Sequence, residues 1–230
     1  MKIKILITII LGISISIYTL SIWSLYFGKN NPQTGFEYLT SMTSKFKEKP
    51  TSEIIFLGDS ITARKDWNKL FESKNILNAG ISGNTTEDVL MRLDPLLNLK
   101  PKKIFIMIGI NDLSKGKDVS FILNNYKIIV NKIKTDSPDT ILFIESVLPI
   151  DNELSPIGKI DSQKIVNLNI GLKSLADEVD ATFINLYPNF INKDNAMDTR
   201  YASDGVHPNA TGYTFLKTLL SPYLDENFIR

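Results

Sequence analysis

The chain contains a single histidine, His207, and the residues around it could support nucleophilic catalysis. Asp204 precedes this histidine by three residues, and Pro208 follows it. On a tight turn, a carboxylate at that spacing can bind one imidazole nitrogen and leave the other nitrogen facing a nucleophile. Ser60, shortly after the apolar run 54–57, is the candidate nucleophile. These residue types predict a serine nucleophile, an imidazole base and a carboxylate that orients the base.

Ser60 belongs to the run GDSIT at positions 58–62, between an expected strand and a helix expected to begin near Thr62. At that place the hydroxyl would be exposed at a sheet edge, and the backbone N–H would lie near a helix amino terminus, which favours negative charge. The alternative is that Asp59 or Ser60 only caps the helix. Because Thr62 replaces the second glycine of a G-x-S-x-G pattern, the run argues against an α/β-hydrolase nucleophile elbow.

Two further loops carry groups that could stabilise an oxyanion. Gly83 precedes Thr85 and Asp88, which are spaced as a capping box at a helix start. Without a side chain, Gly83 could let its N–H approach a substrate oxygen closely, although a turn glycine is the simpler interpretation. Asn111 offers a side-chain amide, a donor type used for oxyanions, but Asn-Asp after a strand is also common in plain turns.

Short apolar segments alternate with amphipathic segments after residue 52. The expected strands are 53–57, 75–79, 103–108, 140–146 and 181–186. The expected helices are 64–73, 87–98, 118–135, 161–178 and 210–223. This alternation predicts an α/β protein with a parallel sheet covered on both faces. Because chemistry gathers at the carboxyl ends of parallel strands, the polar runs after the first three strands should share one edge.

Together these motifs resemble those of the SGNH hydrolases, the GDSL family of esterases and lipases, over residues 51–224. Four blocks in the family's order carry the resemblance: GDSIT at 58–62, NAGISG at 78–83, GIND at 109–112 and DGVHPN at 204–209. The resemblance implies a three-layer α/β/α flavodoxin-like sandwich with a five-stranded parallel sheet. Asn84 departs from the family's pattern, in which many members have aspartate.

The resemblance also implies roles for five residues. Ser60 would be the nucleophile, His207 the base and Asp204 its partner. The oxyanion hole would consist of the N–H groups of Ser60 and Gly83 and the amide of Asn111. Since all five residues are present, a non-catalytic binding module is disfavoured.

The expected reaction is hydrolysis of a carboxylic ester through an acyl-enzyme, without metal or cofactor. O-acetyl or other short acyl groups on a glycan or lipid are the expected substrates. An acyltransferase acting on a cell-surface glycan and a lysophospholipase are the alternatives. The loops 151–162 and 187–201 should determine specificity, and the sequence does not settle the oligomeric state.

Composition excludes several other chemistries. Lysine and arginine total 26 against 25 acidic residues, so no basic field favours nucleic acid. Cysteine is absent, which excludes disulfides and thiolate catalysis. One histidine and no cysteine argue against zinc or iron, whereas an oxygen-ligand calcium site stays open.

The first residues predict a membrane anchor. Positions 5–27 are 23 consecutive uncharged residues, about 34 Å as a helix, enough to cross a hydrocarbon core of about 30 Å. Lys2 and Lys4 precede this span, which predicts a catalytic domain on the extracytoplasmic side. The predicted organisation is an anchor at 1–28, a tether at 29–50 and a hydrolase domain at 51–230. The alternative is a cleaved signal peptide and a secreted enzyme.

Overall fold

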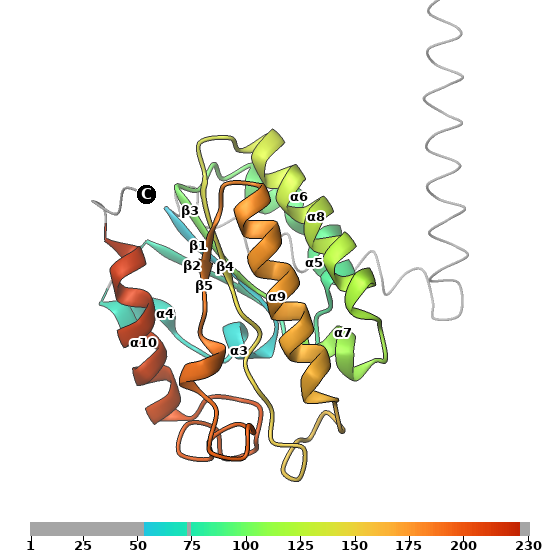
Figure 1. Cartoon of the computed structure of the whole chain (residues 1–230). Helices are drawn as coiled ribbons and strands as arrows, with labels where there is room; N and C mark the ends of the chain where they lie inside the picture. The colour runs from blue at the N-terminus through green and yellow to red at the C-terminus, as the bar shows by residue number, and fades with distance from the viewer. Residues whose placement is uncertain (1–52, 73–74, 226–230) are drawn as a thin grey trace, which may run out of the picture. The chain divides into compact units, whose positions relative to one another are not determined.

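A computed structural model describes residues 53–72 and 75–225 of the chain (Figure 1). Within these residues, five parallel strands form one sheet in the order β2-β1-β3-β4-β5. The strands are β1 (Ile54–Gly58), β2 (Ile76–Gly80), β3 (Lys103–Met107), β4 (Ile141–Glu145) and β5 (Thr182–Ile184). This is the strand order of flavodoxin-like doubly wound sheets. The predicted five-stranded parallel sheet is confirmed, although β5 is only three residues long.

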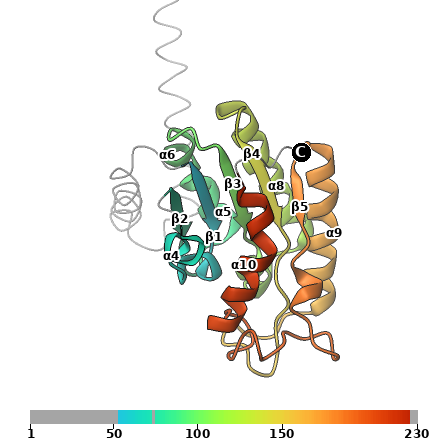
Figure 2. The same cartoon turned by 90° about the vertical axis from the view of Figure 1, so that its left-hand side faces the viewer.

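Helices lie on both faces of the sheet, as the two views in Figures 1 and 2 show. One face carries α4 (Trp67–Phe71) and α10 (Ala210–Leu224). The other face carries α5 (Thr86–Met91), α6 (Leu93–Leu97), α8 (Val119–Asp136) and α9 (Ser162–Glu178). Two short helices, α3 (Ser60–Ala63) and α7 (Ile110–Ser114), follow β1 and β3 at the carboxyl edge. The sequence predicted a helix start near Thr62 and a helix at 64–73; the structure divides this region into α3 and α4.

A row of aromatic rings fills the face beneath α4 and α10. Phe56, Phe105 and Phe143 lie on the three neighbouring strands β1, β3 and β4, with ring centroids 4.8 and 4.4 Å apart. Trp67 of α4 stacks on Phe56 at 4.4 Å. Stacked rings of this kind bury a large apolar area in a fixed geometry. The indole N–H of Trp67 also donates to the Thr62 carbonyl at 2.9 Å, so the core is joined directly to α3.

The predicted helix 87–98 is wrong in one respect, because the structure breaks it at Arg92. Pro95 explains the break: in a continuous helix its ring would clash with the carbonyl of Met91, four residues earlier. Arg92 ends α5 and precedes α6, with φ −115° and ψ 13°. Its side chain is 1% exposed, so the arginine points into the protein.

The predicted anchor at 1–28 and tether at 29–50 lie outside the described residues. Across 53–72 and 75–225, none of the helices has the length and apolar character needed to cross a membrane.

Glu145, the last residue of β4, is a buried carboxyl group with a consequence for stability. Burial raises its pKa to about 8. In the unfolded chain a glutamate titrates near 4.3. Between about pH 4 and pH 8 the folded chain therefore holds a proton that the unfolded chain has released, and stability falls as pH rises through that interval.

Glu145→Gln should remove this pH dependence, because glutamine is neutral at every pH and has nearly the same shape. At pH 8 we expect the variant to melt on the order of 5 °C higher than the unmodified chain, and at pH 4 the two should melt alike. Thermal unfolding followed by circular dichroism between pH 4 and pH 8 measures this. Glu153→Gln, on an exposed glutamate, is the control for loss of a carboxylate. An equal fall in melting temperature for Glu145→Gln and the unmodified chain would contradict the prediction.

Candidate active site

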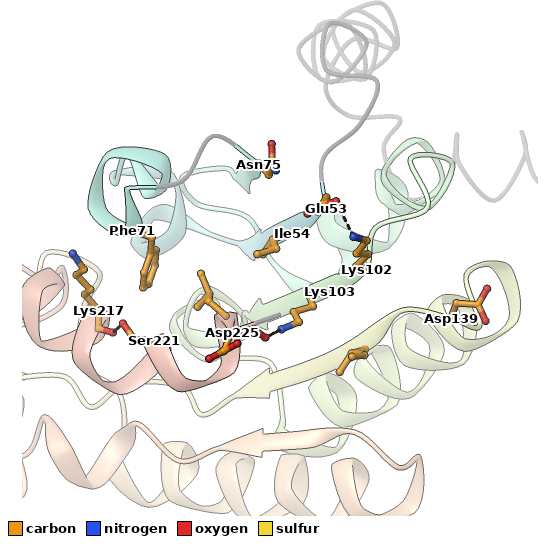
Figure 3. A pocket seen from close by; sticks show the side chains of 12 residues that line it. Glu53, Ile54, Phe71, Asn75, Lys102, Lys103, Asp139, Lys217, Ser221 and Asp225 are labelled. Carbon is orange, nitrogen blue, oxygen red and sulfur yellow. Dashed lines mark hydrogen bonds and ion pairs between the residues drawn. The ribbon is translucent and has the colours of Figure 1, made fainter. Parts of the chain in front are cut away.

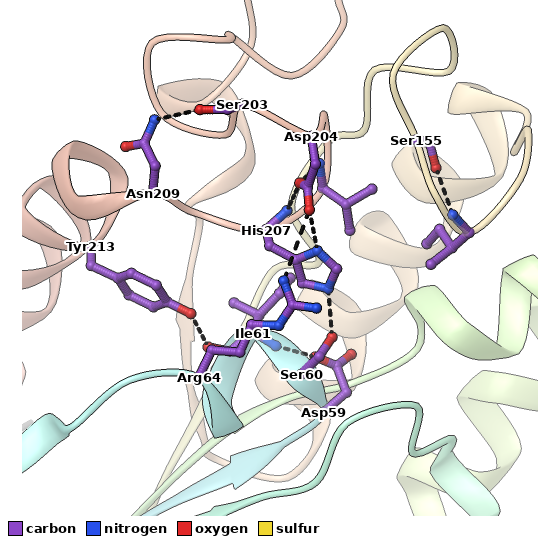
Figure 4. A network of polar contacts seen from close by, with 12 residues as sticks. Asp59, Ser60, Ile61, Arg64, Ser155, Ser203, Asp204, His207, Asn209 and Tyr213 are labelled. Atoms are coloured by element: carbon purple, nitrogen blue, oxygen red, sulfur yellow. Dashed lines mark hydrogen bonds and ion pairs between the residues drawn. The ribbon is translucent and has the colours of Figure 1, made fainter.

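Ser60, His207 and Asp204 form a continuous chain of hydrogen bonds at the carboxyl edge of the sheet (Figure 4). The Ser60 hydroxyl lies 2.9 Å from Nε2 of His207, although the two residues are 147 positions apart. Nδ1 of His207 lies 2.7 Å from Oδ2 of Asp204. The predicted convergence of these three side chains is therefore confirmed. Ser60 is 8% exposed and His207 is 9% exposed, so their contact lies largely away from water.

The backbone after Asp204 holds its carboxylate in place. Oδ1 accepts hydrogen bonds from the N–H groups of Val206 at 3.0 Å and of His207 at 2.7 Å. Partial burial alone would raise the pKa of Asp204, but these bonds and the one from the imidazole outweigh it and lower the pKa below its usual value. The Arg64 guanidinium lies 3.8 Å from Oδ2, at the exposed side of the pair. Asp204 is thus ionised at neutral pH and can hold the imidazole in one orientation.

The helix cap and the candidate nucleophile are different residues. Asp59 is the N-cap of α3, and its Oδ1 accepts from the Ile61 N–H at 2.9 Å. Burial raises the pKa of Asp59 to about 7. Of the two cap candidates that the sequence offered, Asp59 caps α3, so the Ser60 hydroxyl is left to point at His207.

Three side chains from other elements hold the carbonyl groups of the α3 turn, which a short helix cannot satisfy by itself. The Tyr213 hydroxyl donates to the Ile61 carbonyl at 2.6 Å, and the Trp67 indole donates to Thr62 as described above. The two hydrogens of the Asn78 amide are shared among the carbonyls of Thr62, Ala63 and Lys65, in α3 and just after it, at 2.8 to 3.3 Å. The turn that carries Ser60 is therefore fixed from α10, α4 and β2.

The loop after β2 brings Gly83 to the same edge. Its φ of +79° lies in the left-handed region that favours glycine, and a Cβ built there would have no neighbour within 4 Å. The space where a side chain would stand at this position is therefore open. Thr85 caps α5 and forms the predicted capping box with Asp88, which fixes the end of this loop.

Asn111 lies in the first turn of α7, a short helix that the sequence did not predict after the third strand. Its Nδ2 donates to the Asn84 carbonyl at 2.9 Å. The amide of Asn111 is thereby held against the residue that follows Gly83. Since an amide nitrogen carries two hydrogens, the second one remains for a substrate oxygen.

A buried polar cluster beside the site, which the sequence did not predict, joins α7 to α5 and α8. Asp112 is fully buried and accepts from the N–H and the hydroxyl of Thr86, at 3.0 and 2.6 Å for the shortest contacts. The Asn125 amide of α8 donates to the same hydroxyl at 2.9 Å. Burial raises the pKa of Asp112, and the bonds from Thr86 oppose that rise. The signal available in the sequence was a polar residue, Thr86, at the start of α5, together with an aspartate, Asp112, shortly after β3.

The predicted specificity loop 151–162 contacts two parts of the site. The Asp151 N–H donates to the Gly205 carbonyl at 2.8 Å, inside the turn that carries the histidine. The Ser114 hydroxyl at the end of α7 donates to the Ile157 carbonyl at 2.6 Å. The loop therefore connects the turn that carries His207 with α7, and a loop that determines specificity is expected at such a position beside the site.

A cavity of about 740 Å³ lies at the opposite, amino-terminal edge of the sheet (Figure 3). Its lysines are engaged: Lys102 pairs with Glu53, and Lys103 donates to the carbonyl groups of Tyr223 and Asp225. Ser60 and His207 do not line this cavity, so it is separate from the candidate active site. Among residues 53–72 and 75–225, no group of three or more His, Asp or Glu side chains is arranged to hold a metal ion.

The structure is a flavodoxin-like α/β protein in which a hydroxyl, an imidazole and a carboxylate are hydrogen-bonded at the carboxyl edge of the sheet. The chain belongs to the GDSL-like lipase/acylhydrolase family, whose model matches residues 56–215. It is therefore an enzyme that hydrolyses ester bonds. The resemblance to the SGNH hydrolases is confirmed.

Curated relatives agree with this assignment. Human platelet-activating factor acetylhydrolase IB subunit alpha1 is 28% identical over 177 residues, covering 74% of this chain and 73% of the relative. The rat alpha2 subunit is 27% identical over 167 residues, covering 70% of this chain and 71% of the relative.

Solved structures show the same fold. A Streptococcus pneumonia structure named for platelet activating factor superimposes with a TM-score of 0.74 at 27% identity, covering 92% of this chain and 99% of that one. A GDSL-like lipase from Bacteroides thetaiotaomicron gives a TM-score of 0.69 at 25% identity, covering 81% and 95%.

Proposed function

We propose that this protein is a serine esterase in which Ser60 attacks the carbonyl carbon of a short-chain ester. The observation that carries the proposal is the unbroken chain of hydrogen bonds from Ser60 Oγ through the His207 ring to Asp204. A hydroxyl bonded to an imidazole whose far nitrogen is held by a carboxylate is the arrangement that activates a serine at neutral pH.

The proposed steps follow from this geometry. Nε2 of His207 accepts the Ser60 proton as Oγ bonds to the carbonyl carbon, and the ionised Asp204 stabilises the imidazolium. The N–H groups of Ser60 and Gly83 and the amide of Asn111 donate to the oxyanion. His207 then protonates the departing alcohol. A water molecule, deprotonated by His207, hydrolyses the acyl-enzyme and restores the Ser60 hydroxyl.

Short acyl groups, above all acetyl, are the proposed substrates. The curated relatives at 27% and 28% identity are acetylhydrolases by name, and their similarity spans about 70% of this chain. The proposed anchor at 1–28 would put the domain next to esters of the cell surface, so O-acetyl groups on a glycan or lipid are the proposed natural esters.

A chain-length series tests this proposal. We expect kcat/KM for p-nitrophenyl acetate to exceed that for the octanoate by at least about tenfold, because a small acyl pocket rejects added methylenes. Acetylated glycan and lysophospholipid, assayed for released acetate and fatty acid, identify the physiological class. Preference for octanoate or lysophospholipid would contradict the acetyl assignment.

The full-length chain should sediment with membranes and resist salt extraction, whereas a shortened soluble form would favour signal cleavage.

A further inference from the structure

Arg92 is a buried cation that no step of the proposed reaction uses. Its guanidinium donates from three different nitrogens to three oxygens: Nε to the Asn84 side chain at 2.8 Å, Nη1 to the Ala79 carbonyl at 2.7 Å and Nη2 to the Gly58 carbonyl at 2.9 Å. All three oxygens are neutral, and the charge of Arg92 also acts on the buried Asp59 carboxyl, where it opposes the rise in pKa that burial causes. The Gly58 and Ala79 carbonyls lie at the carboxyl ends of β1 and β2, and Asn84 lies on the loop after β2, at the edge where Ser60 meets His207.

Each oxygen lies close in the chain to a proposed oxyanion donor. Gly58 is the last residue of β1 and lies two residues before Ser60, whose N–H group would hold the oxyanion. Asn84 directly follows Gly83, so the bond to its side chain holds the next residue along from the second donor. The bond that the Ala79 carbonyl accepts from Arg92 holds the end of β2, just before the same loop.

The third donor is reached through Asn84. The Asn84 side-chain oxygen accepts from Arg92, while its backbone carbonyl accepts from the Asn111 amide at 2.9 Å. One residue therefore joins the guanidinium to the amide that would face the substrate. The path from Arg92 to Asn111 consists of two hydrogen bonds and a single residue.

The cost of burying this charge supports a positioning role. Moving a cation out of water costs several kcal/mol, and an apolar side chain of similar size can replace such a group without that cost. A planar guanidinium, in contrast, can hold three acceptors at fixed angles to one another. Oxyanion donors act only when they are already aligned with the developing charge.

This inference rests on the proposed function: we propose that Arg92 is a positioning residue that aligns the three oxyanion donors. It holds the ends of β1 and β2 that lead to Ser60 and Gly83 and, through Asn84, it holds the Asn111 amide. Its effect should appear in kcat, since the donors bind the transition state more tightly than the bound substrate. A residue needed only for folding would change the melting temperature and leave kcat of the folded fraction unchanged.

Arg92→Lys tests the proposal, because lysine keeps the charge but cannot hold three acceptors in one plane. We expect kcat for p-nitrophenyl acetate to fall about 10- to 100-fold, with KM within about threefold. Asn84→Ala, which removes one acceptor and keeps the backbone carbonyl, should lower kcat about tenfold. If Arg92→Lys does not fold, the kcat of Asn84→Ala tests the proposal instead.

A double-mutant cycle identifies the route of the effect. Asn111→Ala alone should lower kcat on the order of 10²–10³-fold. If Arg92 acts partly through Asn111, the double variant should lose about tenfold less than the product of the two single losses. Lys103→Met is the matched control: Lys103 is 6% exposed and binds backbone carbonyls at the opposite edge, so it should lower the melting temperature and leave kcat unchanged.

Normal kcat in folded Arg92→Lys and Asn84→Ala would overturn the role of Arg92, and full multiplication of losses in the double variant would overturn the route through Asn84 to Asn111. Absence of Ser60-dependent turnover in the unmodified chain would instead count against the proposed function itself. The two failures are therefore distinguishable.

Discussion

Ser60→Ala is expected to lower kcat for p-nitrophenyl acetate by about 10⁶-fold, the loss measured when a serine hydrolase loses its nucleophile. The Ser60 hydroxyl lies 2.9 Å from Nε2 of His207, and within the described chain it is the hydroxyl that is hydrogen-bonded to this imidazole. Stability should change little, because Asp59 caps α3 and the removed group is one oxygen. Initial-rate kinetics on purified protein, with circular dichroism to verify folding, measure both quantities.

Ser203→Ala provides the matched control. Ser203 is an exposed serine beside Asp204 and accepts only from the Asn209 amide, at 3.4 Å (Figure 4). Its removal should leave kcat within about twofold, in line with other surface substitutions. A folded Ser60→Ala protein with more than one per cent of the original turnover would remove Ser60 from the nucleophile role.

His207→Ala should cost about as much as the loss of Ser60, since either residue alone disables proton transfer from the hydroxyl. The double variant of Ser60 and His207 should lose no more than either single variant, because the residues act as one unit. The imidazole ring is almost completely buried, so its removal leaves a cavity beside Oγ. Added imidazole should enter this cavity and restore part of the activity.

The same rate measurements, with and without imidazole, decide the role of His207. Multiplication of the two single losses in the double variant would mean that Ser60 and His207 act independently. A His207→Ala protein of normal turnover would show that another base serves Ser60.

The residues of the candidate site could be predicted to lie together because few residues could fill each proposed role. The chain has one histidine, and its partner lies three residues earlier on a turn, so Asp204 and His207 had to lie together. The parallel sheet followed from the alternation of apolar and amphipathic segments, which placed the turns of Ser60, Gly83 and Asn111 at one edge.

The residues that hold the site could not be predicted in the same way. Arg92 was part of an amphipathic segment in which a charged residue would ordinarily face water, yet its side chain is buried among neutral oxygens. Asn78 was part of a motif without a stated role, yet its amide binds carbonyls in α3 and just after it. Such contacts depend on side-chain directions in the folded chain, and sequence spacing does not reveal them.

The most direct test of the account is the site of covalent modification by a p-nitrophenyl alkylphosphonate, which transfers its phosphonyl group to an activated serine oxygen and releases p-nitrophenolate. We predict one adduct per chain, parallel loss of esterase activity, and fragmentation spectra of the tryptic peptide ending at Arg64 that assign the added mass to Ser60. Inactivation with the adduct on another residue, or undiminished turnover in protein fully modified at Ser60, would contradict the assignment.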